Sequence, residues 1–382
     1  MSCCKKALAF VMTYAVSLSL WHRLGLLDRE VKVLKFLSRL YDKVFLFTYG
    51  GFEDIRYIDY LPRNTIVLIN FTGSNLLYSL LAPFIYRRLL RRFKLVVCRT
   101  VQLFGCWLCL ILKLLYGSKF ILRQGYQLSK FLRRERRILL YLFARLLEFL
   151  SYLLADVIVV TSEKDKKYIV EKYYVNPSKV YVIPNWVDVN VFKPMHNIEK
   201  EKGRIVFVGR LEHQKNVFAL VDAVKTLPNI KLYIIGEGTL KKPLEYKIEK
   251  ERISNVVLLG AIPNEKLPYE LNRAEIFVLP SLWEGHPKAL IEAMACGLPV
   301  IGSDVEGIKE VIVHGFNGLL CKPDPKSIRS TILTLINNPE LRKKLGENAR
   351  RFVVENYSIE KVMRKELALH LWLLKTRGRQ YN

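Results

Sequence analysis

The sequence is poor in the residues that mark disordered or fibrous chains. Its 382 residues include only 20 glycines and 15 prolines, whereas 51% are hydrophobic. That composition excludes a disordered or collagen-like protein. The length is typical of two domains, each large enough to bury its own core. We therefore expect a globular protein of two domains.

Cysteine is also scarce, and its spacing predicts no disulfides. The seven cysteines form an odd set without paired spacing, in a chain too large to need disulfide staples. We expect reduced, mostly buried thiols. Cys106 and Cys109 have the spacing of a redox motif, but they lie in the apolar run 103–112, where packing is the expected role. Lys113 ends this run, which is too short to span a bilayer.

Acidic residues are outnumbered, because 61 Lys and Arg against 35 Asp and Glu give a net charge of +26. Such charge favours polyanions, phosphorylated small molecules or an anionic membrane as partners. Residues 81–140 hold fourteen of the cations and one acidic residue, Glu135. Apolar residues alternate with these cations, which is typical of helices with a basic face.

This basic patch is either a solvated face or a surface that binds the cytoplasmic leaflet of a membrane. Its apolar neighbours could enter the interface, although some of them must instead pack in the core: Leu89, Leu90, Phe93 and Phe131. Eight of its fourteen cations are the arginines expected to meet the membrane: Arg87, Arg88, Arg91, Arg92, Arg133, Arg134, Arg136 and Arg137.

The N-terminal segment allows two interpretations. Lys5 and Lys6 followed by the apolar residues 7–21 resemble the start of a secretory signal, although no convincing cleavage site follows. Alternatively, residues 6–12 form the first strand of a parallel sheet. The pattern downstream favours the strand.

Short apolar segments alternate with helical stretches along most of the chain. This alternation predicts an α/β fold with two doubly wound, Rossmann-like domains, whose ligands bind at the carboxyl ends of the strands. The polar segment after residue 194 separates the two domains, so we expect domains at 1–195 and 196–358, followed by a closing helix at 359–382. The expected strands are 43–47, 65–70, 93–98, 119–123, 156–161, 204–208, 231–235, 255–259, 276–279, 299–302 and 318–321.

The segment 281–304 carries the most informative pattern. Pro287 suits the first position of a helix that follows the strand at 276–279. Gly285 permits close backbone approach, and the first helical amides, those of Lys288 and Ala289, suit the hydroxyls or phosphates of a ligand.

Two carboxylates lie beside this helix start. Glu284 precedes the helix and Glu292 falls in its second turn, and carboxylates so placed suit the hydroxyls of a sugar. Alternatively, Glu284 caps the helix and Glu292 lies on its solvent face.

A second element follows the strand at 204–208. Gly209 frees space at the turn, and Arg210 and Lys215 are placed to reach a diphosphate. Arginine would give planar bidentate contacts and lysine a point charge.

Together these elements resemble the family 4 retaining glycosyltransferases of the GT-B fold. The resemblance is close over residues 157–355. Its motifs are Gly209-Arg210 with Lys215, Gly236-Glu237-Gly238, the pair Glu284 and Glu292, and the segment 183–188.

The resemblance implies a nucleotide-sugar site. Arg210 and Lys215 would hold the donor diphosphate, Glu284 would contact the transferred sugar, and Glu292 would bind the ribose hydroxyls. Backbone amides of His286, Pro287, Lys288, Ala289 and Leu290 would complete the donor site, proline supplying no N–H itself.

The first domain departs from the family pattern. Residues 13–19 contain no glycine where many relatives have a Gly-Gly loop. Relatives often place a histidine after the strand that corresponds to 119–123, and this chain has Arg123 and Gln124 there. Gln124, Arg123 or His22 remain open as substitutes.

The resulting interpretation is a retaining hexosyltransferase, cytoplasmic and peripheral on the inner face of a membrane. It would move a sugar from a nucleoside-diphosphate sugar to a lipid-linked or glycan acceptor, with Arg210 and Lys215 stabilising the leaving diphosphate. No Asp-x-Asp pair is found at a strand end, so we expect no obligatory metal and no cofactor besides the donor.

Two other classes stay open. A sugar-nucleotide epimerase would share the donor pocket but need no acceptor surface. A basic module that binds nucleic acid would lose affinity steeply with salt, and it leaves the segment from Glu284 to Glu292 unexplained. We therefore expect no nucleic acid partner. The sequence does not set the sugar, the base or the acceptor.

Overall fold

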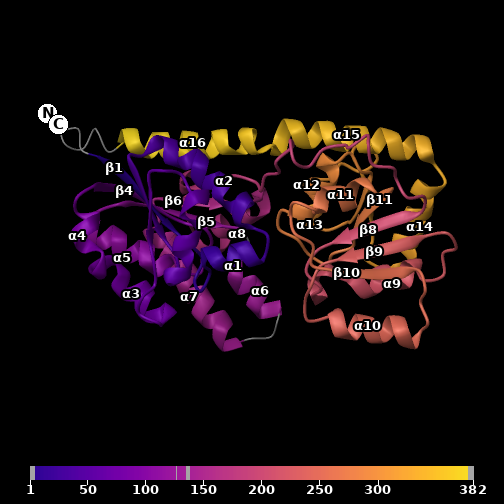
Figure 1. The fold of residues 1–382 in the computed structure, drawn as a ribbon, viewed down its shortest axis with the longest axis horizontal. Helices are drawn as coiled ribbons and strands as arrows, with labels where there is room; N and C mark the ends of the chain where they lie inside the picture. Colours follow the sequence, from indigo (N-terminus) through magenta and orange to yellow (C-terminus); the bar gives the residue numbers. More distant parts are fainter. Residues whose placement is uncertain (1–4, 126, 135–137, 377–382) are drawn as a thin grey trace. The chain divides into compact units, whose positions relative to one another are not determined.

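The computed structural model describes residues 5–125, 127–134 and 138–376. The chain divides into two compact units (Figure 1). Unit 1 comprises Met1–Ile183 and Met363–Asn382, and unit 2 comprises Pro184–Val362. This division differs from the one drawn from the sequence, because it falls before the polar segment and returns the end of the chain to unit 1.

Unit 1 is built on a parallel sheet of seven strands in the order β3-β2-β1-β4-β5-β6-β7. The strand expected at 6–12 is confirmed as β1, which is buried between β2 and β4. The short β7 was not predicted, because three residues at a sheet edge carry almost no periodic signal. The strands are β1 Lys6–Val11, β2 Lys43–Phe47, β3 Thr65–Leu68, β4 Lys94–Thr100, β5 Lys119–Gln124, β6 Val157–Val160 and β7 Val180–Val182.

The helices of unit 1 cover this sheet. Cys106 and Cys109 lie on α5 and are fully buried, and burial raises the pKa of the Cys106 thiol to about 12. The packing role expected for this pair is confirmed. The helices are α1 Leu18–Arg23, α2 Leu27–Leu37, α3 Asn75–Ile85, α4 Arg87–Leu90, α5 Cys106–Tyr116, α6 Leu128–Arg134, α7 Ile138–Leu154, α8 Glu163–Tyr173 and, from Met363 onward, α16 Ile359–Thr376.

A buried ionic cluster fastens α16 to the sheet of unit 1. The Glu366 carboxylate lies 2.5 Å from an Arg99 guanidinium nitrogen and 4.0 Å from one of Arg123. Burial alone would raise the pKa of Glu366, but the two cations hold it below its usual range. One turn later, the His370 ring nitrogen Nδ1 lies 2.7 Å from the Tyr41 hydroxyl. The C-terminal helix is therefore an integral part of unit 1.

Unit 2 is built on a parallel sheet of six strands in the order β10-β9-β8-β11-β12-β13. Each strand predicted in this half is present, with bounds that shift by at most one residue. The predicted α/β fold with two doubly wound sheets is thus confirmed. The strands are β8 Arg204–Val208, β9 Lys231–Ile235, β10 Val256–Gly260, β11 Ile276–Leu279, β12 Val300–Ser303 and β13 Leu319–Cys321.

The helices of unit 2 connect these strands and pack on a core of aliphatic side chains from the sheet. They are α9 Val217–Val224, α10 Lys241–Lys250, α11 Leu267–Asn272, α12 Lys288–Ala295, α13 Glu306–Lys309, α14 Pro325–Ile336 and α15 Pro339–Tyr357.

Candidate functional site

Two glycine loops meet at the carboxyl ends of β8 and β9. Gly236 has a φ of 147°, and a Cβ added to it would lie 1.9 Å from the Gly209 carbonyl oxygen. A Cβ on Gly238 would lie 2.4 Å from the carbonyl oxygen of Leu211. Only glycine permits this contact between backbones, so both glycines are needed to shape the loop that carries Arg210.

A short 3-10 helix, His213–Lys215, leads from this loop into α9. Asn216 follows it with a φ of 53°, and its side-chain amide donates to the carbonyl oxygens of Pro280 and Pro323. These bonds tie the Gly209 loop to the segment after β11. They explain how a lysine and a glutamate far apart in the sequence come together.

Lys215 and Glu284 form an ion pair at the ends of β8 and β11. The Lys215 Nζ lies 2.5 Å from Glu284 Oε1, and the Ser281 hydroxyl donates to the same oxygen at 2.6 Å. The amide of Gln214 donates to the other oxygen at 3.4 Å. The Glu284 side chain is only 7% exposed, so its charge is held by these partners.

This pairing joins two residues for which the sequence motifs predicted separate roles. In the structure, the charge of Lys215 is already matched by Glu284, whereas Arg210 is exposed on the loop. A diphosphate placed beside Lys215 would share its ammonium with the carboxylate. The arrangement can therefore couple an anionic group to a sugar hydroxyl through one ion pair.

The start of α12 lies next to this pair in the sequence. The helix begins at Lys288. Pro287 is therefore the cap residue before the helix and not its first residue, as the sequence predicted. Asn185 donates its side-chain amide to the His286 carbonyl oxygen at 2.7 Å, and the His286 ring packs edge-on against Tyr357 at 4.7 Å. These contacts hold the helix entrance, whose first amides lack acceptors within the helix.

Glu292 is buried in the second turn of α12, with 5% of its surface exposed. The alternative that placed it on the solvent face was wrong. Glu284 does not cap the helix either, since Pro287 occupies the cap position and no side chain caps it. Both carboxylates are therefore held inside unit 2.

Sequence reasoning missed Gly307. A Cβ on this residue of α13 would lie 2.0 Å from the Gly285 carbonyl oxygen and 2.4 Å from that of Glu284. Gly307 lets α13 pack directly on the backbone of the candidate site. A single glycine near a helix start gives no signal that would distinguish this role.

The three residues of unit 1 that could replace the family's histidine have different surroundings. Gln124 is buried and accepts a hydrogen bond from the Tyr152 hydroxyl at 2.8 Å. Arg123 belongs to the ionic cluster around Glu366. His22 is exposed at the end of α1, with its ring 5.0 Å from that of Tyr57.

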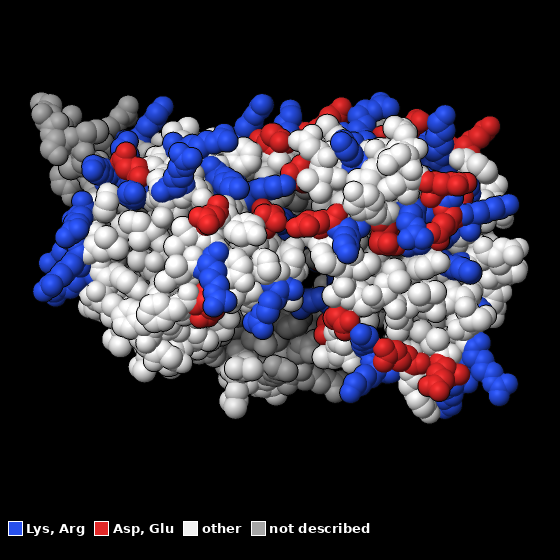
Figure 2. Space-filling model, in the orientation of Figure 1, with Lys and Arg blue, Asp and Glu red and all other residues white. Residues whose placement is uncertain are grey.

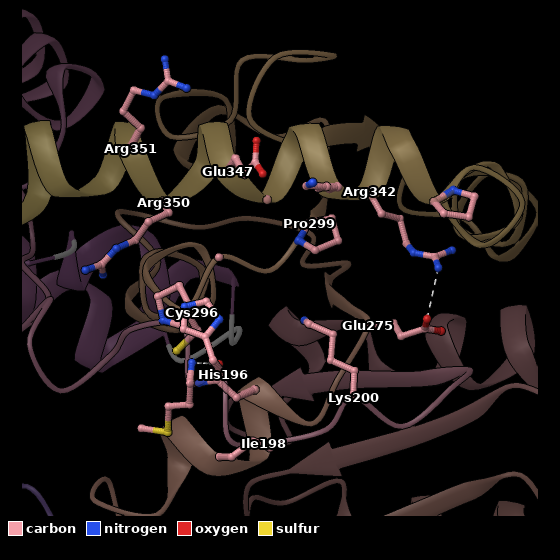
Figure 3. Close-up of a pocket in the computed structure, with 17 residues that line it drawn as sticks. His196, Ile198, Lys200, Glu275, Cys296, Pro299, Arg342, Glu347, Arg350 and Arg351 are labelled. Atoms are coloured by element: carbon pink, nitrogen blue, oxygen red, sulfur yellow. Dashed lines mark hydrogen bonds and ion pairs between the residues drawn. The ribbon is translucent and has the colours of Figure 1, made fainter.

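A pocket of about 700 Å³ in unit 2 lies away from the predicted donor residues. It is bounded by α15, by the segment 194–200 and by the residues that precede β11 and β12 (Figure 3). Arg342 donates to Glu275 across it at 3.1 Å (Figure 3). Because this pocket is at the amino ends of the strands, it is distinct from the candidate site.

The basic patch is only partly as expected. Arg87, Arg88, Arg91 and Arg92 are exposed on and just after α4, and Arg133 is exposed on α6. Among the apolar neighbours, Leu90 is fully buried.

Leu89 and Phe93 are half-buried against the core of unit 1, so they and Leu90 are the apolar neighbours that pack in the core. The side chains of Arg134 and Phe131 are not described, and Arg136 and Arg137 lie outside the described residues.

The part of the chain that the structure describes holds neither a cluster of metal ligands nor a membrane-spanning helix. No three His, Cys, Asp or Glu side chains of this part of the chain gather as a metal site. None of the described helices is long and apolar enough to cross a membrane.

Comparison with known proteins identifies the family. Residues 31–191 match the family model for Glycosyltransferase Family 4, and residues 188–352 match that for Glycosyl transferases group 1. The chain belongs to this glycosyltransferase family. The candidate site lies within the group 1 match.

Two relatives illustrate the glycosyltransferase match. An uncharacterized glycosyltransferase of Methanocaldococcus jannaschii is 37% identical over 200 residues, which cover 50% of this chain and 55% of that protein. The UDP-Gal:alpha-D-GlcNAc-diphosphoundecaprenol alpha-1,3-galactosyltransferase of Escherichia coli is 30% identical over 225 residues, covering 54% and 58%. The chain thus matches little more than half the length of these relatives.

The fold of the glycosyltransferase is shown by a solved structure. Sucrose-phosphate synthase from Thermosynechococcus elongatus superposes with a TM-score of 0.77 at 20% identity, covering 97% of this chain and 100% of that chain. The two Rossmann-like units therefore form the GT-B fold.

Proposed function

We propose that this chain is a retaining hexosyltransferase that transfers a sugar from a UDP-sugar to a lipid-linked acceptor. The observation that carries the proposal is the ion pair of Lys215 and Glu284, which lies at the carboxyl ends of β8 and β11 beside the Gly209 loop. Membership of the glycosyltransferase family and the relative that uses UDP-galactose support it.

The donor diphosphate would bind to the two cations of the Gly209 loop. Arg210 is exposed and free to turn towards phosphate oxygens, and Lys215 would divide its charge between the diphosphate and Glu284. As the bond from the sugar to the diphosphate breaks, negative charge grows on the leaving group. These cations and the first amides of α12 would stabilise it without a proton transfer.

Glu284 would orient the transferred sugar by accepting hydrogen bonds from its hydroxyls. Its partners Ser281 and Gln214 hold the carboxylate in place before the donor arrives. Glu292, buried one helical turn further along, would take the ribose hydroxyls of the nucleotide.

The acceptor is proposed from the Escherichia coli relative, whose name describes a sugar linked to diphosphoundecaprenol. An acceptor of this kind is held in a membrane, so the enzyme would work as a peripheral protein at the cytoplasmic face. The buried cysteines described in the structure are free thiols, as a reducing compartment favours.

No metal or nucleic acid takes part in the proposed reaction. Arg210, Lys215 and the helix amides supply the positive field that a metal ion would otherwise provide. An epimerase is disfavoured by the family match, and a nucleic acid module would leave the Lys215–Glu284 pair unused.

Titration of the protein with UDP, together with assays of UDP-hexoses against membrane extracts, tests the proposal. We expect UDP to bind the wild type and to bind Lys215→Met at least about tenfold more weakly. A labelled lipid product with the anomeric configuration of the donor sugar is also expected. Absence of UDP binding, or a product with inverted configuration, would contradict the proposal.

A further inference from the structure

The helix α3 exposes an uninterrupted apolar face. Tyr78 and Ala82 on its other side are fully buried in the core of unit 1. Residues 71–86, which contain the helix, include no charged side chain. The exposed residues recur in pairs one turn apart, and each residue is 38 to 55% exposed: Leu76, Leu77, Leu80, Leu81, Phe84 and Ile85.

The helix α7 has a second face of the same kind. Its only charged residues are Arg145 and Glu148, and Glu148 is buried, where it accepts a hydrogen bond from the Ser129 hydroxyl at 2.7 Å. The exposed face is formed by residues at helical spacing, each at least 49% exposed: Leu139, Leu142, Phe143, Leu146, Phe149 and Leu153.

The helices α3 and α7 cover the same side of the sheet, and both apolar faces lie on the outer side of these helices. Buried residues of α3, α5 and α7 belong to one core cluster, which packs on one face of the strands of unit 1. Leu114 and Leu115, at the end of α5, are 78% and 46% exposed. We call the exposed sides of α3, α5 and α7 the apolar face. It is far more hydrophobic than the scattered exposed residues of an ordinary surface.

Arginines border this face. Arg87, Arg88, Arg91 and Arg92 follow α3 directly, are all exposed, and form no ion pair with any described carboxylate. Figure 2 shows uncharged atoms over α3 and gathered Lys and Arg over α4. Apolar side chains with a cationic margin are the composition that binds the interface of an anionic bilayer.

We propose that the apolar face of unit 1 inserts into the surface of an anionic lipid bilayer. The helices α3 and α7 would lie in the interface with their leucines among the acyl chains, and the four arginines would meet lipid phosphates at the margin. The absence of a spanning helix among the described residues fits this shallow binding. The inference deepens the proposed function, since it supplies the surface that reaches a lipid-linked acceptor.

Charge favours a bilayer over a second copy of this chain. A symmetric dimer through the apolar face would bring two sets of unpaired arginines together around the same contact, and like charges at an interface weaken association. A lipid phosphate surface instead offers each arginine a counter-charge.

The apolar face and the arginines have separable roles. Insertion of leucines should give binding to neutral and anionic vesicles alike, because it depends on apolar area. The arginines should give the preference for anionic vesicles, and only this part should weaken with salt.

Flotation with phosphatidylcholine vesicles, with and without phosphatidylglycerol, tests the inference. The test variant carries Leu77→Gln, Leu81→Gln, Phe143→Gln and Leu146→Gln. The control carries four substitutions of similarly exposed residues elsewhere, Leu371→Gln, Tyr246→Gln, Val313→Gln and Phe316→Gln. Leu81 and Leu371 are matched in particular, since each is 44% exposed.

We expect the test variant to bind both kinds of vesicle at least about tenfold more weakly than wild type, and the control to bind as wild type does. Replacing the four arginines by glutamine should remove only the preference for anionic vesicles. Melting curves and UDP titrations should be unchanged for the test variant, because the substituted side chains lie outside both core and donor site.

Equal flotation of test variant and wild type would overturn the inference, as would failure of the wild type to float. A lipid-free dimer that the test variant abolishes would show that a second copy covers the apolar face instead. Vesicle binding without UDP binding would leave this inference standing while the proposed function fails, so the two are separable.

Discussion

The Lys215 ammonium and the Glu284 carboxylate lie 2.5 Å apart, although 69 residues separate them in the sequence. One of these groups is expected to meet the phosphate end of a donor and the other its sugar. Because they touch, a change in either residue alters the charge felt by both ends of the ligand.

Glu284→Gln should lower the rate of transfer at saturating donor by at least about tenfold, or roughly 1.4 kcal/mol in the barrier. The amide keeps the shape of the side chain but cannot match the charge of Lys215. Steady-state turnover measures this. The control is Glu245→Gln, which removes an exposed carboxylate on α10, outside the candidate site. Near-normal turnover of Glu284→Gln would remove this residue from the site.

Arg210→Ala should also reduce transfer by about tenfold, and mainly through weaker donor binding. The side chain is exposed, so its removal should leave the melting temperature unchanged. Donor affinity and KM are the readouts. Arg351→Ala is the matched control, because that arginine is also exposed and lies on α15, outside the candidate site. Equal effects of the two substitutions would mean that net charge, and not the site, is responsible.

Gly307→Ala should disrupt the donor site by displacing the backbone of Glu284 and Gly285. Its Cβ would lie 2.0 Å from the Gly285 carbonyl oxygen, so the backbone before α12 must move. We expect weaker UDP binding and a lower melting temperature. Gly315→Ala is the control, since its added Cβ meets no atom within 4 Å and carries only the strain of a φ of 76°. Wild-type UDP affinity in Gly307→Ala would contradict this close packing.

Unit 1 should lose stability as the pH falls from 7 to 5. Burial lowers the pKa of His370 to about 4, with the nearby Glu366 opposing and Arg99 assisting the shift. The unfolded chain binds a proton near pH 6.5, so the neutral folded form is fully favoured only above that pH. The loss by pH 5 is about 2 kcal/mol for this group.

Hydrogen exchange of the α16 amides at both pH values measures this loss. His370→Gln should reduce the difference, because glutamine does not titrate. A full pH effect in that variant would assign it to other groups.

Chelation should leave transfer largely intact. In the proposed site, the charge of the diphosphate is stabilised by Arg210, Lys215 and the first amides of α12. Activity in excess EDTA, before and after addition of magnesium or manganese, is the measurement. Loss on chelation with recovery on metal addition would show that a metal ion takes part.

Buried strands were the most predictable part of the fold. The segments that form β8, β9 and β11 are continuous apolar runs, because both faces of a parallel sheet are covered. The contact of Gly307 with Gly285 was not predictable, since it depends on how α13 returns to the sheet. The same holds for the pairing of Lys215 with Glu284, although each residue was singled out for its chemistry.

The surface of unit 1 shows a different limit of sequence reasoning. The sequence of an apolar helix such as α3 predicts a helix buried in the core, because hydrophobic periodicity does not distinguish an exposed apolar face from a buried one. The sequence therefore could not tell which apolar neighbours of the basic patch pack in the core, as Leu90 does, and it did not indicate that Leu77 and Leu81 are exposed.

The division of unit 1 into two stretches of chain also bears on its synthesis. Arg99 and Arg123 leave the ribosome well before Glu366, and all of unit 2 is made between them. Unit 2 can therefore complete its fold while unit 1 still holds two cations without their carboxylate. A chain cut short after unit 2 would keep that defect and leave the residues beneath α16 uncovered. The helix α16 thus makes the stability of unit 1 depend on residues that are made after unit 2, and chains that lack α16 become targets for proteases.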